Sequence, residues 1–334
     1  MPSRIDNDGA DKLFSSANVV SRFLALDQIY KAHELDAHLL SMQDDTLSSD
    51  PDVIILCASA ILAIPEAVFE WAVQYQCKTS NDNIGRPRHR RRFVLVLCGG
   101  IGPSTTFVYD AIEANARYYD VFDEVQGKPE AHVLRVIAER FYGLQVDTHG
   151  LEEEAHDGPS TIKNQNGLTI LMAARSINCG ASSSEARRVL ESYGIRSPRS
   201  ITVVQDPAMS RRTVTSFECA YSDLSAHGIQ IGSWPVLNPG FGTKSIKETK
   251  SMKKPHGSSE DGIQLDNGRG LWSMDRFLDR ILAEMPRVRA NGDGYGFAPL
   301  VDVPDEVEDA WSTVLDGHGS NELGCLQPKL SSRI

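Results

Sequence analysis

Metal-binding and redox motifs are missing from this 334-residue sequence. None of its six cysteines forms a C-x-x-C pair, and its nine histidines include no H-E-x-x-H or similar spacing. Those patterns mark zinc sites, dithiol redox sites and metalloproteases. The sequence therefore predicts no metal site, and its thiols are expected to be reduced, as in cytosolic proteins.

Long apolar runs are also missing. No window approaches the 18 or more apolar residues of a membrane-spanning helix. The first residues, MPSRIDNDGADKLF, lack the basic start and apolar stretch of a signal peptide. We therefore expect a soluble, cytoplasmic protein with no membrane partner.

Positive charge is scarce in this chain. Its 34 Lys and Arg residues stand against 45 Asp and Glu residues, which gives a formal net charge of −11. Nucleic-acid binding depends on Lys and Arg side chains that neutralise phosphates. Nucleic acid is therefore not an expected partner, and the sequence leaves the oligomeric state open.

Four short apolar runs rich in β-branched residues define the fold class. They are DVIILCA (52–58), FVLVLCGG (93–100), LTILMAA (168–174) and ITVVQDP (201–207). Each run is continuous, which is typical of strands buried on both faces of a parallel sheet. Amphipathic helices are predicted at 65–76, 130–143, 182–195 and 270–286, and the segment 307–315 is expected to close the domain. This alternation predicts an α/β fold with an open, mostly parallel sheet, helices on both faces and a C-terminal helical extension.

Three of the predicted helix ends carry signals of their own. Ser182, Ser183 and Glu185 come close to a capping box, which predicts a helix start at 182. Gly143 and Gly194 predict the ends of two helices, because glycine readily adopts the left-handed conformation found there.

Polar stretches at 78–92, 149–167 and 242–262 divide the chain, and their compositions predict mobile loops. The expected organisation begins with an N-terminal helical segment at 1–48. An α/β domain follows at 49–241, interrupted by the first two stretches. Residues 263–316 then complete the same domain, and 317–334 form a tail.

A glycine turn follows the second apolar run. Gly99, Gly100 and Gly102 permit positive φ and close backbone approach, while Ser104 and Thr105 can cap the next helix and donate to an anion at its N-terminus. Ligands of open parallel sheets bind beyond the carboxyl ends of the strands, so this turn is a candidate ligand site. It matches neither G-x-G-x-x-G nor a Walker A loop. The alternative is a plain strand-to-helix turn with Ser104 or Thr105 as its N-cap.

Further polar residues follow the fourth and third runs. Asp206 can bind ribose hydroxyls or a cationic group, and Arg211 can clamp a carboxylate or phosphate. The alternative is an N-capping Asp206 that pairs with Arg211. Asn178 and Cys179 follow the third run, but no basic partner is placed by sequence that would make Cys179 a nucleophile.

Two other stretches carry weaker signals. Glu130 opens a predicted helix, where a negative charge favours the helix dipole and where a general base would need a substrate in reach. The segment NGDGYGFAPLVD (291–302) has part of the spacing of a calcium loop, but Tyr295 stands where an oxygen ligand is needed. Calcium is therefore not expected.

Several of these segments, in order, resemble the YdcF-like family, which includes the SanA proteins. They are GGIGPSTTFVYDAI (99–112), Glu130-Ala131, SINCG (176–180), VVQDPAMSRRTVTSF (203–217) and two C-terminal stretches at 270–296 and 301–315. The resemblance covers most of residues 50–316. It implies a Rossmann-like fold and S-adenosylmethionine as the small-molecule ligand, with an undefined reaction. Carried over by position, it implies a ligand site of Gly99, Gly100, Gly102, Ser104, Thr105, Asn178 and Asp206, with Glu130 and Arg211 as the candidate catalytic pair.

The chain departs from the family pattern in one region. Ala173 and Ala174 stand where the family usually has an acidic residue, and Gly180-Ala181-Ser182 replaces G-E-N. Whether the protein is an enzyme is therefore left open. One alternative is a non-catalytic ligand sensor or interaction module. A second alternative, a hydrolase of a phosphoester or envelope-glycan precursor, rests only on analogy with the SanA proteins.

Overall fold

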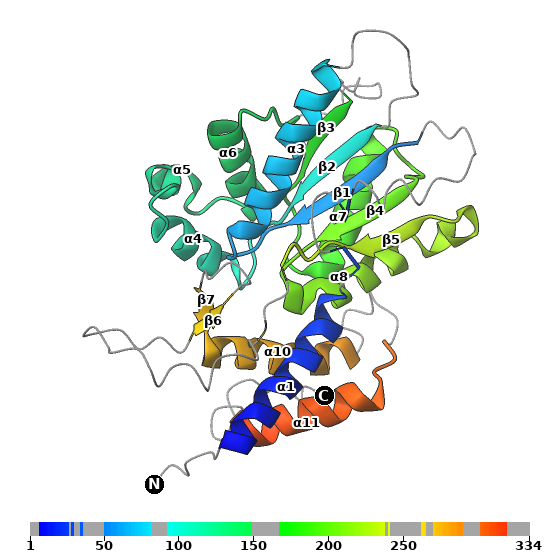
Figure 1. The fold of residues 1–334 in the computed structure, drawn as a ribbon. Helices are drawn as coiled ribbons and strands as arrows, with labels where there is room; N and C mark the ends of the chain where they lie inside the picture. The colour runs from blue at the N-terminus through cyan, green and yellow to red at the C-terminus, as the bar shows by residue number, and fades with distance from the viewer. Residues whose placement is uncertain are drawn as a thin grey trace, which may run out of the picture.

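A computed structural model describes residues 7–26, 28–29, 34–35, 50–81, 92–148, 167–237, 240, 262–264, 270–289 and 301–318 of the chain. Its centre is a five-stranded parallel sheet with helices on both faces, and a group of three helices lies at one end of that sheet (Figure 1). The predicted α/β fold class is confirmed.

The sheet is built from the four predicted strands and one further strand. Its strands are β1 (Asp52–Cys57), β2 (Phe93–Cys98), β3 (Leu168–Ala173), β4 (Ser200–Val204) and β5 (Gln230–Ser233), in the order β3-β2-β1-β4-β5. Every residue of β1 to β4 is buried, as their continuous apolar sequences predict. The edge strand β5 is buried only in its second half, and its QIGS sequence has no apolar run that would have revealed it.

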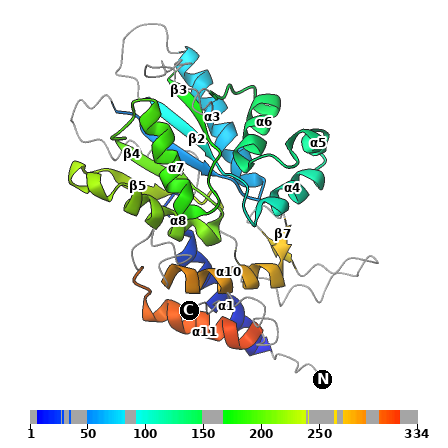
Figure 2. The ribbon, with the colours of Figure 1, turned by 180° about the vertical axis from the view of Figure 1, so that it is seen from behind.

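The helices divide between the two faces of the sheet (Figures 1 and 2). One face carries α3 (Ala63–Asn81), α4 (Thr105–Glu113), α5 (Phe122–Val125), α6 (Glu130–Tyr142) and the 3-10 turn η1 (Tyr119–Val121). The other face carries α7 (Cys179–Ser192) and α8 (Pro207–Ala220), with the 3-10 turn η3 (Ser222–His227) after α8. Right-handed crossovers produce this division, because the chain moves one way from β1 to β3 and the other way from β4 to β5.

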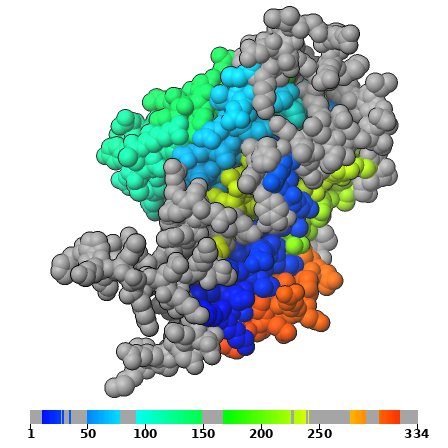
Figure 3. All heavy atoms as spheres, in the orientation of Figure 1, coloured from blue at the N-terminus to red at the C-terminus, as the bar shows by residue number. Residues whose placement is uncertain are grey.

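Three helices from the two ends of the chain share a separate core. They are α1 (Asn7–Ala25), α10 (Met274–Arg289) and α11 (Asp305–His318), and we call them the helical module. Leu24, Phe277, Ile281 and Val314 are fully or almost fully buried within it. Figure 3 shows α1 (blue) and α11 (orange) packed side by side, and both α1 and α10 contact α8. The predicted C-terminal extension therefore includes the N-terminal helix as well.

Two predicted helix starts are wrong. Helix α7 begins at Cys179 because Asn178 caps it: Asn178 Oδ1 accepts a hydrogen bond of 2.8 Å from the Ala181 amide. Ser182 lies within the first turn and donates to the Asn178 carbonyl, so it is not a cap. The stretch from 270 to 273 is strand β7 (Gly270–Ser273), paired antiparallel with β6 (Gly262–Gln264), and α10 begins only at Met274.

The two predicted helix ends at glycine are confirmed. Gly143 has φ of 66° and ends α6, and Gly194 has φ of 78° just beyond α7. The first predicted loop, at 78–92, begins inside helix α3, because α3 continues to Asn81. Residues 82–91, 149–166 and 241–261 lie outside the described residues, as do 291–300 of the rejected calcium loop and the tail beyond His318. No helix in the described parts of the chain is long and apolar enough to cross a membrane.

Candidate functional site

A cavity opens at the carboxyl edge of the sheet. Its wall is formed by the residues that follow β1, β2, β3 and β4, by the start of α6, and by one side of α10. Ala58 to Ala60 follow β1, and Gln205 and Asp206 follow β4, so the cavity spans the point where the strand order reverses. Open parallel sheets bind ligands at this point. Seven of the predicted site residues line it: Gly99, Gly100, Gly102, Ser104, Glu130, Asn178 and Asp206.

The three glycines line the cavity, and close packing of neighbouring protein atoms leaves no space for a side chain at any of them. A methyl group on Gly100 would stand 2.0 Å from the Ser176 carbonyl oxygen, and one on Gly99, at φ of 155°, would stand 2.8 Å from Glu130 Cβ. A methyl group on Gly102 would meet the Ile177 carbonyl oxygen at 2.9 Å. A side chain at any of the three positions would therefore meet protein atoms, while the glycine backbone itself faces the cavity.

Ser104 and Thr105 have different roles. Ser104 stands at the N-cap of α4 without a side-chain cap hydrogen bond, and it lines the cavity. Thr105 is 2% exposed and is not among the lining residues. Its hydroxyl accepts from the Gly102 amide at 2.8 Å and donates to Glu130 Oε1 at 2.9 Å. Thr105 therefore holds the glycine turn and orients Glu130, and the expectation that it binds a ligand directly is corrected.

Glu130 lines the cavity at the first turn of α6. Its amide donates to the Gly100 carbonyl, which fixes the helix start against the glycine turn. Burial raises the pKa of its carboxyl group, and the hydrogen bond from Thr105 partly opposes that shift. A carboxyl group that keeps its proton to higher pH is suited to acid–base chemistry when a substrate is in reach.

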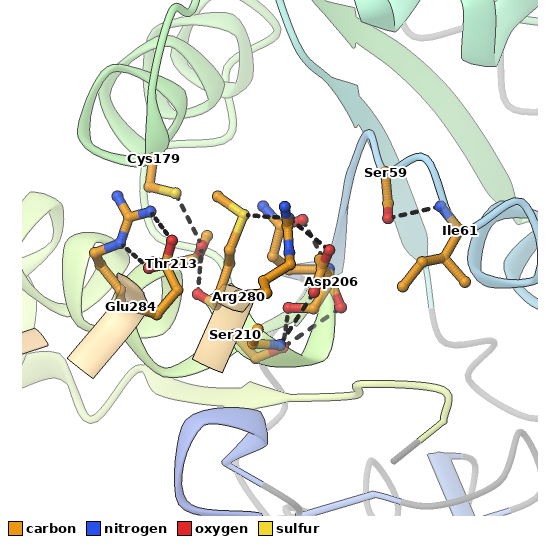
Figure 4. Close-up of polar contacts among 12 residues, drawn as sticks. Ser59, Ile61, Cys179, Asp206, Ser210, Thr213, Arg280 and Glu284 are labelled. Atoms are coloured by element: carbon orange, nitrogen blue, oxygen red, sulfur yellow. Dashed lines mark hydrogen bonds and ion pairs between the residues drawn. The ribbon is translucent and has the colours of Figure 1, made fainter. Parts of the chain in front are cut away.

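Asp206 lies at the start of α8 and is 3% exposed. Its Oδ1 accepts from the Ala208 amide at 3.1 Å, and its Oδ2 accepts from Arg280 Nη2 at 2.6 Å (Figure 4). The Asp206 charge raises the pKa of Arg280, which also reaches Met209 Sδ at 3.2 Å. The predicted N-cap role is confirmed, but the pairing with Arg211 is wrong because α10 brings Arg280 to this carboxylate.

Arg211 lies away from the cavity wall. Its Nε donates to the Phe23 carbonyl at 2.5 Å, and its guanidinium carbon is 3.9 Å from the centre of the Phe23 ring. Burial lowers its pKa. Helix α1 covers this part of α8, so Arg211 holds the helical module and does not meet Glu130. The prediction of a catalytic pair is corrected.

Three cysteines line the cavity: Cys57, Cys98 and Cys179. Cys57 and Cys98 are register partners on β1 and β2, and a hydrogen bond with Cys98 together with burial raises the pKa of Cys57 well above its usual value. Cys179 Sγ accepts from the Thr213 hydroxyl at 3.3 Å (Figure 4). These contacts are those of packed thiols. They give no support to Cys179 as a nucleophile.

Four further polar or aromatic residues line the cavity and were not predicted from the sequence: Ser59, Phe107, Arg276 and Arg280. Ser59 follows β1 and accepts a hydrogen bond of 3.1 Å from the Ile61 amide, so inspection of every strand end would have found it. The two arginines are four residues apart on α10, which places them on one helix face. Only the packing of α10 over the strand ends identifies that face as part of the site.

No group of His, Cys, Asp and Glu residues in the described ranges could hold a metal ion. No known family model matches the chain. The resemblance to YdcF-like proteins therefore stays a prediction from the motifs that carry it.

Proposed function

We propose that this protein binds a nucleotide-type small molecule, S-adenosylmethionine being the first to test, in the cavity at the carboxyl edge of its parallel sheet. The observation that carries the proposal is convergence: polar groups that follow four different strands, together with two arginines of α10, face one cavity. Ligand sites are typically concave and hold a few convergent polar groups.

In this proposal the lining residues have separate tasks. Ser104 and the first turn of α4 face the polar end of the ligand. Asp206 is already bound to the Ala208 amide and to Arg280, so it acts mainly by holding Arg280 in place. Glu130 is the group best suited to donate or accept a proton, because burial raises its pKa.

Calorimetric titration of the full chain with S-adenosylmethionine, adenine nucleotides and sugar phosphates tests the proposal. Ala60 lines the cavity, so Ala60→Phe fills it without removing any polar group. Ala116 is exposed and is not among the lining residues, so Ala116→Phe is the matched control. We expect binding by the wild type and the control and none by Ala60→Phe. Absence of binding by all these ligands, or equal binding by Ala60→Phe, would contradict the proposal.

A non-catalytic sensor is the second candidate, favoured by one specific observation. Ala173, in place of an acidic residue, is fully buried at the end of β3 and holds the glycine turn by accepting from the Gly99 amide. It can supply no chemistry. Turnover of a bound ligand that Glu130→Gln abolishes while binding is retained would decide for an enzyme. Binding without turnover of any ligand tested would decide for a sensor.

A further inference from the structure

Two buried side chains at the point where the strand order reverses carry hydrogen-bond donors without an acceptor. Gln205, after β4, is 5% exposed, and its Oε1 accepts from the Asp206 amide at 2.7 Å. That bond leaves the Nε2 amino group of Gln205 without an acceptor among the described residues. Ser59, after β1, is 6% exposed, and its Oγ accepts from the Ile61 amide at 3.1 Å (Figure 4). Within the same described ranges, the Ser59 hydroxyl proton has no acceptor either.

An acceptor without a donor lies in the same cavity wall. Glu130 Oε1 accepts from the Thr105 hydroxyl at 2.9 Å, and no described residue donates to Glu130 Oε2. The position of a Cβ on Gly99 is 2.9 Å from this Oε2 and 3.3 Å from Ala58 Cβ, so the oxygen lies near the start of the loop after β1. Glu130 Oε2 and Gln205 Nε2 both keep solvent-accessible surface, and both residues line the cavity.

The sheet brings these donors and this acceptor to one place. Strands β1 and β4 are neighbours, with Leu56 paired to Val204, so Ser59 and Gln205 follow adjacent strands at the same edge. Buried polar groups cost free energy unless they are hydrogen-bonded. A ligand hydroxyl satisfies both kinds of group, because its oxygen accepts and its proton is donated. Sugars carry neighbouring hydroxyls, and carboxylates near strand ends bind those of ribose in other α/β proteins.

We propose that the ligand of this cavity places sugar hydroxyl groups between Glu130, which accepts a hydrogen bond, and Ser59 and Gln205, which donate. This inference rests on the proposed function and adds to it the part of the ligand that these residues hold. The ribose of a nucleotide and the sugar of a free sugar phosphate share this chemistry. A site that hydrogen-bonds a hydroxyl strongly rejects an analogue that lacks it, because its own polar groups are then left unpaired.

Calorimetric titration of the full chain with adenosine monophosphate and with its 2′-deoxy and 3′-deoxy forms tests the inference. The wild type is expected to bind at least one deoxy form about tenfold or more weakly than the parent nucleotide. Glu130→Gln keeps an acceptor for Thr105 and replaces the other oxygen with a donor, so it should lower this ratio by about fivefold or more. Gln205→Met and Ser59→Ala should also lower it. Gln126→Met, at an exposed position outside the cavity wall, is the control and should leave it unchanged.

The ratio separates contact from folding, because a general distortion of the site weakens both nucleotides alike. Equal binding of all three nucleotides by the wild type, or a ratio that none of the three site variants lowers, would overturn the inference and leave the proposed function standing. Ribose 5-phosphate is the second source. If it binds, is weakened by Gln205→Met, and adenosine monophosphate does not bind, the sugar contacts are supported and a nucleotide ligand is contradicted. If neither molecule binds, the inference fails, and the proposed function stands only if S-adenosylmethionine binds.

Discussion

At the scale of single residues, Gly100 determines how closely two loops of the site can approach each other. The position of a Cβ at residue 100 is 2.0 Å from the Ser176 carbonyl oxygen, which is a backbone atom and cannot rotate away. Any side chain here must push apart the glycine turn and the segment before α7. A larger residue at 100 would therefore abolish ligand binding by distorting the site, and such a loss would not be evidence of direct contact.

Gly100→Ala is expected to lower the free energy of unfolding by about 3 kcal/mol or more, the upper part of the range for overpacking. Gly194→Ala is the comparison, because a Cβ there meets nothing within 4 Å and only its φ of 78° is unfavourable. We expect it to cost about 1–2 kcal/mol. Urea denaturation of both variants measures the difference, and a smaller loss for Gly100→Ala than for Gly194→Ala would contradict this account.

Glu130 gives a prediction about pH. Its pKa is raised in the folded state by burial, so ionisation is harder in the folded than in the unfolded chain. Below the ordinary value of 4.5 the carboxyl group is protonated in both states. As pH rises from there through the folded pKa, the folded state loses stability relative to the unfolded state. Glu130→Gln should therefore gain stability over the wild type as pH rises through this range. At low pH the stabilities of the two proteins should converge.

Melting temperatures measured from pH 4 to pH 8 test this, with Glu139→Gln on the same helix as a control for the removal of one surface charge. The Glu130 charge also helps to raise the pKa values of Tyr109 and Cys57. Both groups titrate far above this pH range. A wild type that gains stability relative to Glu130→Gln as pH rises would contradict the assignment.

At the scale of elements, helix α7 depends on Asn178. Asn178→Ala is expected to lower the free energy of unfolding by about 1 kcal/mol, the usual loss of an N-cap. Asn178→Asp keeps an acceptor for the Ala181 amide and should retain most of the free energy of unfolding that Asn178→Ala loses. Ser184→Ala, at an exposed position within the same helix, is the control. Chemical denaturation in which Asn178→Ala and Ser184→Ala cost the same would contradict the observed cap.

The elements also mark the limit of what the sequence could predict. Strands β1 to β4 follow from their apolar runs, because a strand buried on both faces needs such residues throughout. The Asp206 cap could be predicted because it depends on residues within two positions. Its pairing with Arg280 could not, because 74 residues separate the two and only the packing of α10 joins them. The start of α7 was misplaced because Asn178 and Ser182 are both good caps and the sequence does not decide between them.

At the scale of the whole molecule, a buried ion pair ties the helical module to the sheet domain. Arg212 on α8 donates from Nε to Glu284 Oε2 on α10 at 3.0 Å, and their side chains are 9% and 4% exposed. Arg287 also donates to Glu284, at 2.7 Å. Because α10 carries Arg276 and Arg280, this pair also positions one wall of the cavity.

Glu284→Gln is expected to cost about 3–5 kcal/mol of unfolding free energy, because it breaks the buried ion pair between Arg212 and Glu284 by making one of its two members neutral. Arg212→Met should cost less, since Glu284 keeps Arg287. Glu308→Gln removes a partly exposed pair of the same module, that of Arg289 and Glu308, and should cost about 0–1 kcal/mol. Equal losses for Glu284→Gln and Glu308→Gln in urea denaturation would contradict the role of the buried pair.

The central claim is that the carboxyl edge of the sheet binds one nucleotide-type molecule. Native mass spectrometry of the purified full chain with added S-adenosylmethionine or adenosine monophosphate tests it most directly, with Ala60→Phe measured beside the wild type. We predict one bound ligand per chain on the wild type and none on Ala60→Phe. A wild type that takes up neither molecule, or an equal adduct on both proteins, would contradict the claim.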